Sequence, residues 1–272
     1  MNAFRQLLKS AGSHPPLGTW IVSASPLAAE AVGHAGFDWA VIDMEHSPLD
    51  LPQVVTLLQA LSATRLVPVV RVSRHDATVV QRVLDGGAAT VMFPVVQTAD
   101  DARRAVAATR YPLDGMRSVA GMSRACGFGT VPNYLKTANA GIGVIVQIDS
   151  LQAIQAIEDI AAVPGVDALF VAPADLCAAS GHLGDAMHPQ VLQLMGDAAR
   201  RARAAGKHIG SWGSTPEQAV QYRALGFDYV ALSSDLGLMM RGAQAVLQSL
   251  RTQDVGSHVH TLHTGTQTAD GR

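Results

Sequence analysis

The segment AVIDMEHSPLD at positions 40–50 runs from apolar residues into three side chains that can carry charge, Asp43, Glu45 and His46. Histidine suits general base catalysis, because its unperturbed pKa lies near neutrality. The alternative is a packed or solvent-facing histidine. The abrupt change predicts that a buried strand ends here at an open site, to which these charges belong.

Two more carboxylates follow apolar runs. Asp149 follows GVIVQI, and Asp175 follows ALFVAPA on the next expected strand. Carboxylates that converge from neighbouring strand ends suit octahedral Mg²⁺ or Mn²⁺, with waters and a ligand completing the shell. Asp149 also precedes the helical pattern SLQAIQAI, so an N-cap role fits equally well. Spacing alone leaves both readings of Asp149 open.

Three further polar residues are candidates for the same site. Arg71 and Gln147 each lie at the end of an apolar run, and Asp85 lies at the end of a helical pattern. Arg71 is able to clamp a carboxylate bidentately, or to form a rim salt bridge with a nearby acid. An acid at the position of Asp85 opposes the helix dipole, which hints at a use other than helix formation.

The elements that position these residues form a repeated pattern. Eight continuously apolar runs, typical of parallel strands buried on both faces, are each followed by a helical pattern. This alternation predicts an α/β fold, and eight units favour a single-domain (β/α)8 TIM barrel over a doubly wound open sheet. The expected strands are 17–23, 37–43, 65–73, 89–97, 143–149, 167–175, 207–213 and 227–235, and the expected helices are 26–36, 49–63, 76–87, 98–110, 150–163, 188–206, 215–226 and 236–251.

A repeated glycine–aspartate motif supports the repeated strand–helix unit. Gly36-Phe37-Asp38, Gly165-Val166-Asp167 and Gly226-Phe227-Asp228 each place a glycine where a helix C′ residue is expected, just before a strand. We therefore assign residues 1–251 to the barrel and residues 252–272 to a disordered polar tail. The loop-rich stretch 111–130 contains Arg117 and Arg124, and is either a cover for an anionic substrate or a structural insertion.

The composition argues against a nucleic-acid-binding, a membrane-spanning or a secreted protein. Hydrophobic residues make up 48% of the 272 residues, and the net charge of −2 lacks the basic bias of a nucleic-acid-binding protein. No apolar run reaches the roughly 18 residues of a membrane span. The N-terminus lacks the pattern of a signal peptide. Cys126 and Cys177 form no CxxC pair, which indicates reduced thiols in a cytoplasmic protein.

Six segments resemble one family. GFDWAVIDMEHSPLD, LVPVVRV, VQRVLDGGA, AATRYPLDGMRS, VIVQID and APADL are similar, in the same order, to segments of HpcH/HpaI aldolases of the phosphoenolpyruvate/pyruvate barrel superfamily. The similarity runs from about Gly18 to about Arg251. It implies a class II aldolase that uses Mg²⁺ or Mn²⁺, with Co²⁺ as a further option, and interconverts a 4-hydroxy-2-oxo acid with pyruvate and an aldehyde.

The resemblance also implies residue roles. The divalent metal stabilises the pyruvate enolate as a Lewis acid. Family members are typically oligomers, often hexamers built from trimers with the last helix exchanged. The matching residues are His46 as base, Asp85 as its partner acid, Arg71 at the enolate, Gln147, Ala174 and Asp175 at the substrate, and Asp149 and Asp175 at the metal.

The chain departs from the family pattern at two places. Asp149 stands where the family has Glu, and RVSRHD at 71–76 replaces a Trp-Asn pair before the aspartate with Arg74 and His75. Two rival functions therefore stay open. One is carbon–carbon bond chemistry on a CoA thioester or oxaloacetate, and the other is a non-catalytic binding protein that has lost its metal.

Overall fold

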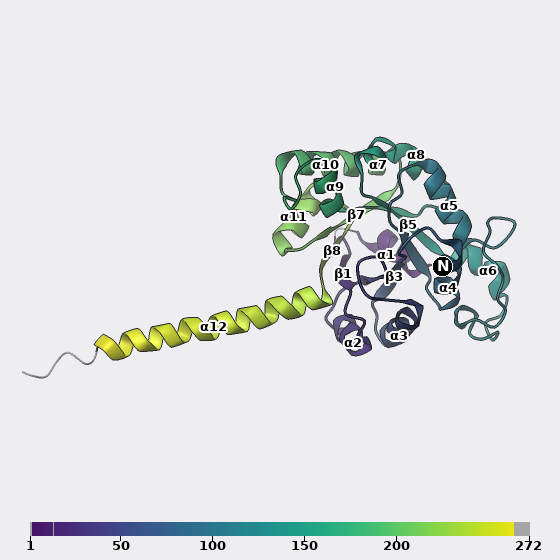
Figure 1. The fold of residues 1–272 in the computed structure, drawn as a ribbon. Helices are drawn as coiled ribbons and strands as arrows, with labels where there is room; N and C mark the ends of the chain where they lie inside the picture. Colours follow the sequence, from purple (N-terminus) through teal and green to yellow (C-terminus); the bar gives the residue numbers. More distant parts are fainter. Residues whose placement is uncertain (1, 13, 264–272) are drawn as a thin grey trace, which may run out of the picture. The chain divides into compact units, whose positions relative to one another are not determined.

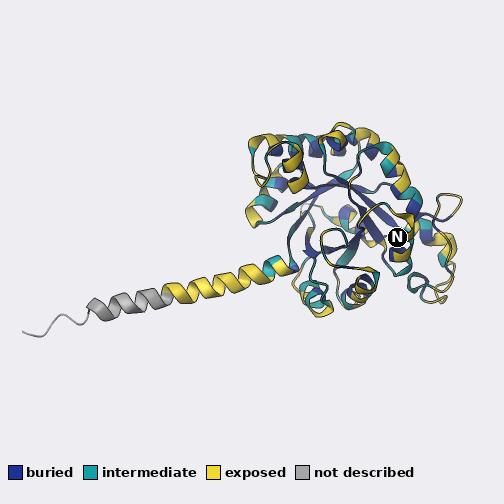
Figure 2. Ribbon diagram, in the orientation of Figure 1, coloured by how far each residue is buried: buried dark blue, intermediate teal, exposed yellow. Residues whose placement is uncertain are grey.

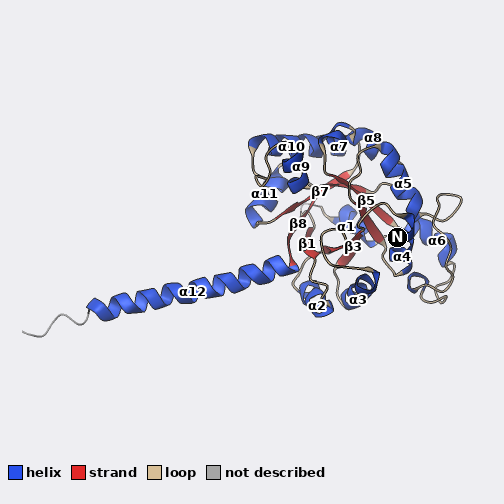
Figure 3. Cartoon of the chain, in the orientation of Figure 1, coloured by secondary structure: helices blue, strands red, loops and turns tan. Residues whose placement is uncertain are grey.

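The computed structural model describes residues 2–12 and 14–263, with side chains described up to Thr252. Eight parallel strands pair in sequence order, and β8 pairs with β1 to close a barrel. Helices surround the strands (Figure 3). The prediction of a (β/α)8 barrel is confirmed.

The elements follow the expected alternation (Figure 1). The strands are β1 (Leu17–Ile21), β2 (Trp39–Asp43), β3 (Val67–Arg71), β4 (Thr90–Phe93), β5 (Gly143–Ile148), β6 (Ala168–Val171), β7 (His208–Gly213) and β8 (Tyr229–Ser234). The helices are α1 (Ala3–Ser10), α2 (Pro26–His34), α3 (Leu51–Leu61), α4 (Ala77–Asp85), α5 (Ala99–Thr109), the 3-10 turn η1 (Arg124–Cys126), α6 (Tyr134–Gly141), α7 (Leu151–Gln155), α8 (Ile157–Ala161), α9 (Pro173–Ala179), α10 (Pro189–Ala204), α11 (Pro216–Ala224) and α12 (Asp235–His263).

Two apolar layers hold the barrel together. One lies between the strands and the surrounding helices, so the strands are buried on both faces (Figure 2). The other fills the barrel interior and is rich in aromatic rings, including Trp39 and Tyr229, whose centroids are 5.4 Å apart. A Cβ on Gly18 would lie 2.3 Å from the Trp39 ring, and one on Gly210 would lie 2.2 Å from the Tyr229 ring. These glycines therefore make room for the rings.

Helix α1 closes the foot of the barrel, the end where the strands begin. Phe4 packs edge-on against Trp39 and Tyr229, the first residues of β2 and β8. Arg5 forms a bidentate pair with Asp167 at 2.7 and 3.0 Å. The buried phenylalanine of α1 seals the interior from below.

The aspartates of the repeated glycine–aspartate motif join neighbouring strands by hydrogen bonds at the foot of the barrel. Each aspartate bonds through its backbone N–H and its carboxylate to the first or second residue of the preceding strand, in the pairs Asp38–Leu17, Asp167–Val144 and Asp228–Ile209. The glycines adopt φ near +100°. Gly36 and Gly226 directly follow the helix C-cap residue, as predicted. Gly165 does not, because α8 already ends at Ala161.

Helix α12 differs from the rest of the chain. One compact unit ends at Asp235 and contains the barrel, and a second begins at Leu236. Helix α12 continues to His263, past residue 252, where the expected tail begins. Residues 252–263 contain no proline, which would end the helix. Residues 264–272 lie outside the described residues. No described helix is long and apolar enough to cross a membrane.

Candidate active site

A cavity of about 300 Å³ opens at the mouth of the barrel, the end where the strands finish. This volume is at the lower end of the range for small-molecule sites. Five of the predicted site residues line the cavity together: His46, Arg71, Gln147, Ala174 and Asp175. Asp43, Ser234 and the apolar side chains of Trp20, Val22, Phe170, Pro173 and Trp212 complete most of its wall.

Arg71 lies at the floor of the cavity and is only 5% exposed. Its Nε and Nη2 donate to the two carboxylate oxygens of Asp43 at 2.9 and 2.8 Å. Its Nη1 lies 2.7 Å from Glu45 Oε2, and the guanidinium carbon lies 4.2 Å above the Trp20 ring. The predicted salt bridge thus exists, but it is buried. The bidentate face expected to clamp a substrate carboxylate already holds Asp43.

Asp43 and Glu45 organise the loop that carries His46. Asp43 Oδ1 accepts the backbone N–H groups of Glu45 and His46 at 2.9 and 3.4 Å. The His46 side chain is 65% exposed, and its Nε2 lies 3.9 Å from Glu45 Oε1. Burial raises the pKa of Glu45, although the Arg71 charge opposes the shift. His46 is therefore reachable by a ligand, on a loop fixed from below.

Asp149 directly follows β5, two residues after Gln147, and does not itself line the cavity. Its Oδ2 accepts the backbone N–H of Val95 at 2.8 Å. Burial raises the pKa of Asp149, and the negative charge of Asp175 raises it further. The N-cap reading of Asp149 is wrong, because Ser150 caps α7 by accepting the N–H of Ala153 at 3.1 Å.

Ala174 and Asp175 occupy a helix and not a strand end. The expected strand 167–175 stops at Val171, and α9 begins at Pro173. Proline favours the first turn of a helix, where its missing N–H costs nothing. Asp175 lies in the first turn of α9, where the helix dipole stabilises a negative charge.

Asp85 is not brought to His46 within one chain. It ends α4, which runs back from the mouth, and β4 begins five residues later at Thr90 on the foot side. Asp85 Oδ1 instead accepts from Arg117 Nη2 at 2.6 Å. The implied dyad of Asp85 and His46 therefore cannot form inside a single chain.

The 111–130 stretch also lies at the foot, because it connects α5 with α6 and β5. Arg117 is buried above the Tyr111 ring at 4.5 Å, and Arg124 donates to the carbonyl of Gly86 at 3.1 Å. Of the two readings left open, the cover over the chain's own mouth is wrong. Both arginines hold the loop against α4.

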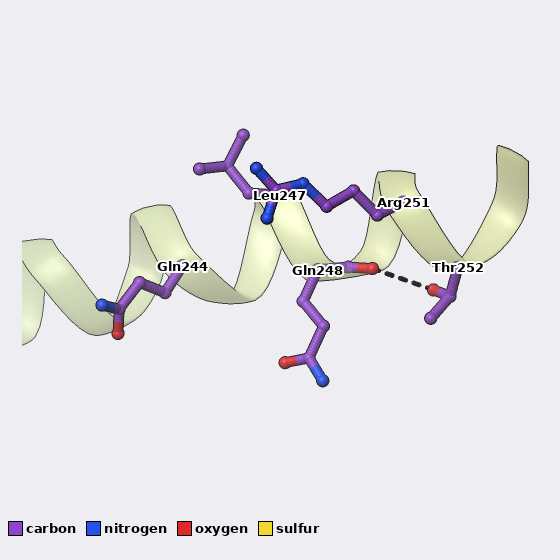
Figure 4. A pocket seen from close by; sticks show the side chains of 5 residues that line it. All are labelled: Gln244, Leu247, Gln248, Arg251 and Thr252. Atoms are coloured by element: carbon purple, nitrogen blue, oxygen red, sulfur yellow. Dashed lines mark hydrogen bonds between the residues drawn. The ribbon is translucent and has the colours of Figure 1, made fainter.

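A larger space of about 570 Å³ lies along α12. Its five lining side chains all come from this one helix, and Thr252 Oγ1 bonds to the carbonyl of Gln248 (Figure 4). A space walled by a single helix is open on its other sides. It encloses no ligand site.

Comparison with known proteins decides the family. The family model described as HpcH/HpaI aldolase/citrate lyase matches residues 17–242. The chain belongs to this family. It is 46% identical to the hydroxypyruvate/pyruvate aldolase of Paraburkholderia phytofirmans, over 93% of this chain and 100% of that protein. It is 42% identical to the 2-dehydro-3,6-dideoxy-6-sulfogluconate aldolase of Pseudomonas putida, over 91% and 97%.

A solved structure agrees with this assignment. The HpcH/HpaI aldolase/citrate lyase family protein from Burkholderia cenocepacia superposes with a TM-score of 0.89 at 44% identity, covering 92% of this chain and 100% of that one. The resemblance found in the sequence is confirmed, as is the class of enzyme, a carbon–carbon lyase, at the level of the family.

The carboxylates of this HpcH/HpaI family member fit a divalent cation. Asp149 and Asp175 offer oxygen ligands. Burial, and to a smaller extent the charge of Asp175, raises the pKa of Asp149, and a nearby cation would favour the ionised carboxylate. Among the described residues no group of three or more His, Cys, Asp or Glu side chains forms a metal site. Two carboxylates plus water and substrate oxygens match Mg²⁺, which usually keeps several waters.

Sequence reasoning did not assign roles to three residues of this site. Asp43 and Glu45 fix Arg71, and Trp20 lies beneath it. The signal for Asp43 was present, because an acid that directly continues a buried run needs a partner. Trp20 carried no such signal, since its apolar neighbours in β1 make it resemble any core residue.

Proposed function

We propose that this chain is a divalent-metal-dependent aldolase that cleaves or forms 4-hydroxy-2-oxo acids, with pyruvate and an aldehyde as the other reactants. The observation that carries this proposal is the mouth cavity, which gathers His46, Arg71, Gln147 and Asp175 around one space of small-molecule size. The names of the two aldolases reported above support the same reaction class.

Each side chain of the cavity has a role that follows from its position. Arg71 keeps its positive charge at the floor, held in one orientation by Asp43, and would stabilise negative charge on the oxygen of the 2-oxo group. Its Nη1 also faces Gln147 Oε1 at 3.4 Å, so the two polar groups present one surface to the 2-oxo acid. His46, exposed at the rim, would take the proton of the C4 hydroxyl during cleavage.

Asp149 and Asp175 would hold the cation. A bound divalent cation supplies Lewis-acid stabilisation of the enolate charge that forms when the C3–C4 bond breaks. The cation would add to the positive charge of Arg71, which is already shared between the carboxylates of Asp43 and Glu45. Among the described residues no lysine lies at the carboxyl end of a strand, so the site offers no lysine for a Schiff base with the 2-oxo group.

The test is cleavage of a panel of 4-hydroxy-2-oxo acids, measured as pyruvate release. We expect chelation to abolish release, and Mg²⁺, Mn²⁺ or Co²⁺ to restore it. Full activity in chelator would contradict the metal role. Turnover of an acyl-CoA thioester with oxaloacetate, without pyruvate release, would replace the proposed reaction with the rival one.

A further inference from the structure

The carboxylate of Asp149 is held by the turn that follows β4. The N–H of Val95 donates to Asp149 Oδ2 at 2.8 Å, and the N–H of Val96 donates to the carbonyl of Gln147 at 3.3 Å. One carboxylate oxygen is thereby fixed against a backbone amide. The conformation of the turn decides which way the carboxylate faces.

This turn has an unfavourable backbone conformation. Val95 has φ of +51°, a region that a β-branched residue rarely adopts. The Val95 side chain is 52% exposed, so burial of the side chain does not hold it there. Contacts of the neighbouring backbone must therefore hold the conformation.

His75 provides such a contact from the turn between β3 and α4. Its Nε2 donates to the carbonyl of Pro94, the residue before Val95. Its ring packs edge-on against Phe93, the last residue of β4, with centroids 5.5 Å apart.

We propose that His75 is a positioning residue, which fixes the Pro94–Val95 turn and, through the Val95 N–H, orients the Asp149 carboxylate toward the site it shares with Asp175. This rests on the proposed function, because it takes Asp149 as a ligand of the divalent cation.

The experiment is titration of the full-length protein with Mn²⁺, followed by electron paramagnetic resonance of the free ion. His75→Phe keeps the ring against Phe93 but removes the N–H donor. Loss of a group that orients a ligand typically weakens metal affinity about 10–100-fold, and we expect a loss in this range. His75→Gln returns an N–H donor and should bring affinity back to within about threefold of wild type. Both variants are checked by thermal melting.

A double variant distinguishes an effect on the orientation of the Asp149 carboxylate from a general loss of stability. In Asp149→Asn, whose affinity is already reduced, adding His75→Phe should change Mn²⁺ binding little, because the two act through one carboxylate. Wild-type affinity in His75→Phe, or no recovery in His75→Gln, would overturn the inference while leaving the metal role intact. An equal loss on both backgrounds would also overturn it. Absence of Mn²⁺ binding by the wild type would overturn the proposed function and this inference together.

Discussion

Asp43 connects the charged group at the floor of the cavity with the histidine at its rim. The same carboxylate accepts from the Arg71 guanidinium and from the backbone of the loop that carries His46. An ion pair that is 2% and 6% exposed is costly to break, because one partner would keep an unpaired buried charge. Asp43 therefore holds both the Arg71 guanidinium and the backbone of the His46 loop through one carboxylate.

His46 is the residue whose loss should affect chemistry most and folding least. His46→Ala should lower kcat about 10²–10⁴-fold, the usual range for a general base. Because the side chain is 65% exposed, the melting temperature should hardly move. Steady-state cleavage and melting curves measure both. His34→Ala, at the end of α2, is the control and should keep wild-type kcat. Unchanged kcat in His46→Ala would refute the assignment.

Glu45 should make stability depend on pH. Burial raises its pKa in the folded state, so its contribution to stability is complete below its unfolded pKa and is lost as pH rises through the folded value. Glu45→Gln removes this titration. As pH rises from about 4, the unfolded pKa, through the raised folded pKa, we therefore expect the variant to gain free energy of unfolding relative to wild type. Urea unfolding of both proteins in chelator tests this, and a pH-independent difference would argue against it.

At the scale of elements, the barrel interior depends on glycine as much as on aromatic rings. Gly18→Ala and Gly210→Ala would place a Cβ within about 2.3 Å of a buried ring, and overpacking of a core costs typically 1–3 kcal/mol. Gly141→Ala is the control, since nothing lies within 4 Å of its added Cβ. Chemical denaturation of the three variants should show destabilisation only for the two interior glycines. An equal effect at Gly141 would show that backbone freedom, and not space, decides.

The strands and helices were predictable because their apolar periodicity is a local property. The exceptions arose where two local signals compete. Pro173 ended β6 by starting a helix, and Ser150 took the cap position that the pattern also allowed for Asp149. Asp85 was placed by motif, and only the direction of α4 shows that it lies at the other end of the barrel. Contacts between turns, such as that of His75 with Pro94, have no signature in the sequence.

At the scale of the whole molecule, the chain carries an apolar surface that suits association with a second copy. Met239, Met240, Val246, Leu247 and Leu250 of α12 are each more than half exposed. They recur at helical spacing, and contiguous exposed apolar residues typically mark an interface. We propose that the protein is a homo-oligomer, in keeping with the trimers or hexamers that the resemblance implies.

Oligomerisation would also allow Asp85 of one copy to contact His46 of another. If Asp85 is the partner acid of His46, the two residues must come from different copies of the chain. Co-expressed His46→Ala and Asp85→Ala chains should then regain activity that neither has alone, because some mouths would combine an intact His46 with an intact Asp85. His46→Ala mixed with Arg71→Ala is the control and should stay inactive, since these two residues line one cavity of one chain. No recovery in the first mixture would leave Asp85 with its role at Arg117 alone.

The sealed foot of the barrel also sets the order in which reactants travel. Phe4, Trp39 and Tyr229 fill the interior below the cavity, so in the described part of the chain molecules enter and leave the barrel by its mouth. On the proposed function, the 2-oxo acid lies against Arg71 and Gln147 at the floor, with the aldehyde above it. Cleavage should then release the aldehyde first and pyruvate last. In product-inhibition kinetics, pyruvate should compete with the substrate, whereas the aldehyde should not.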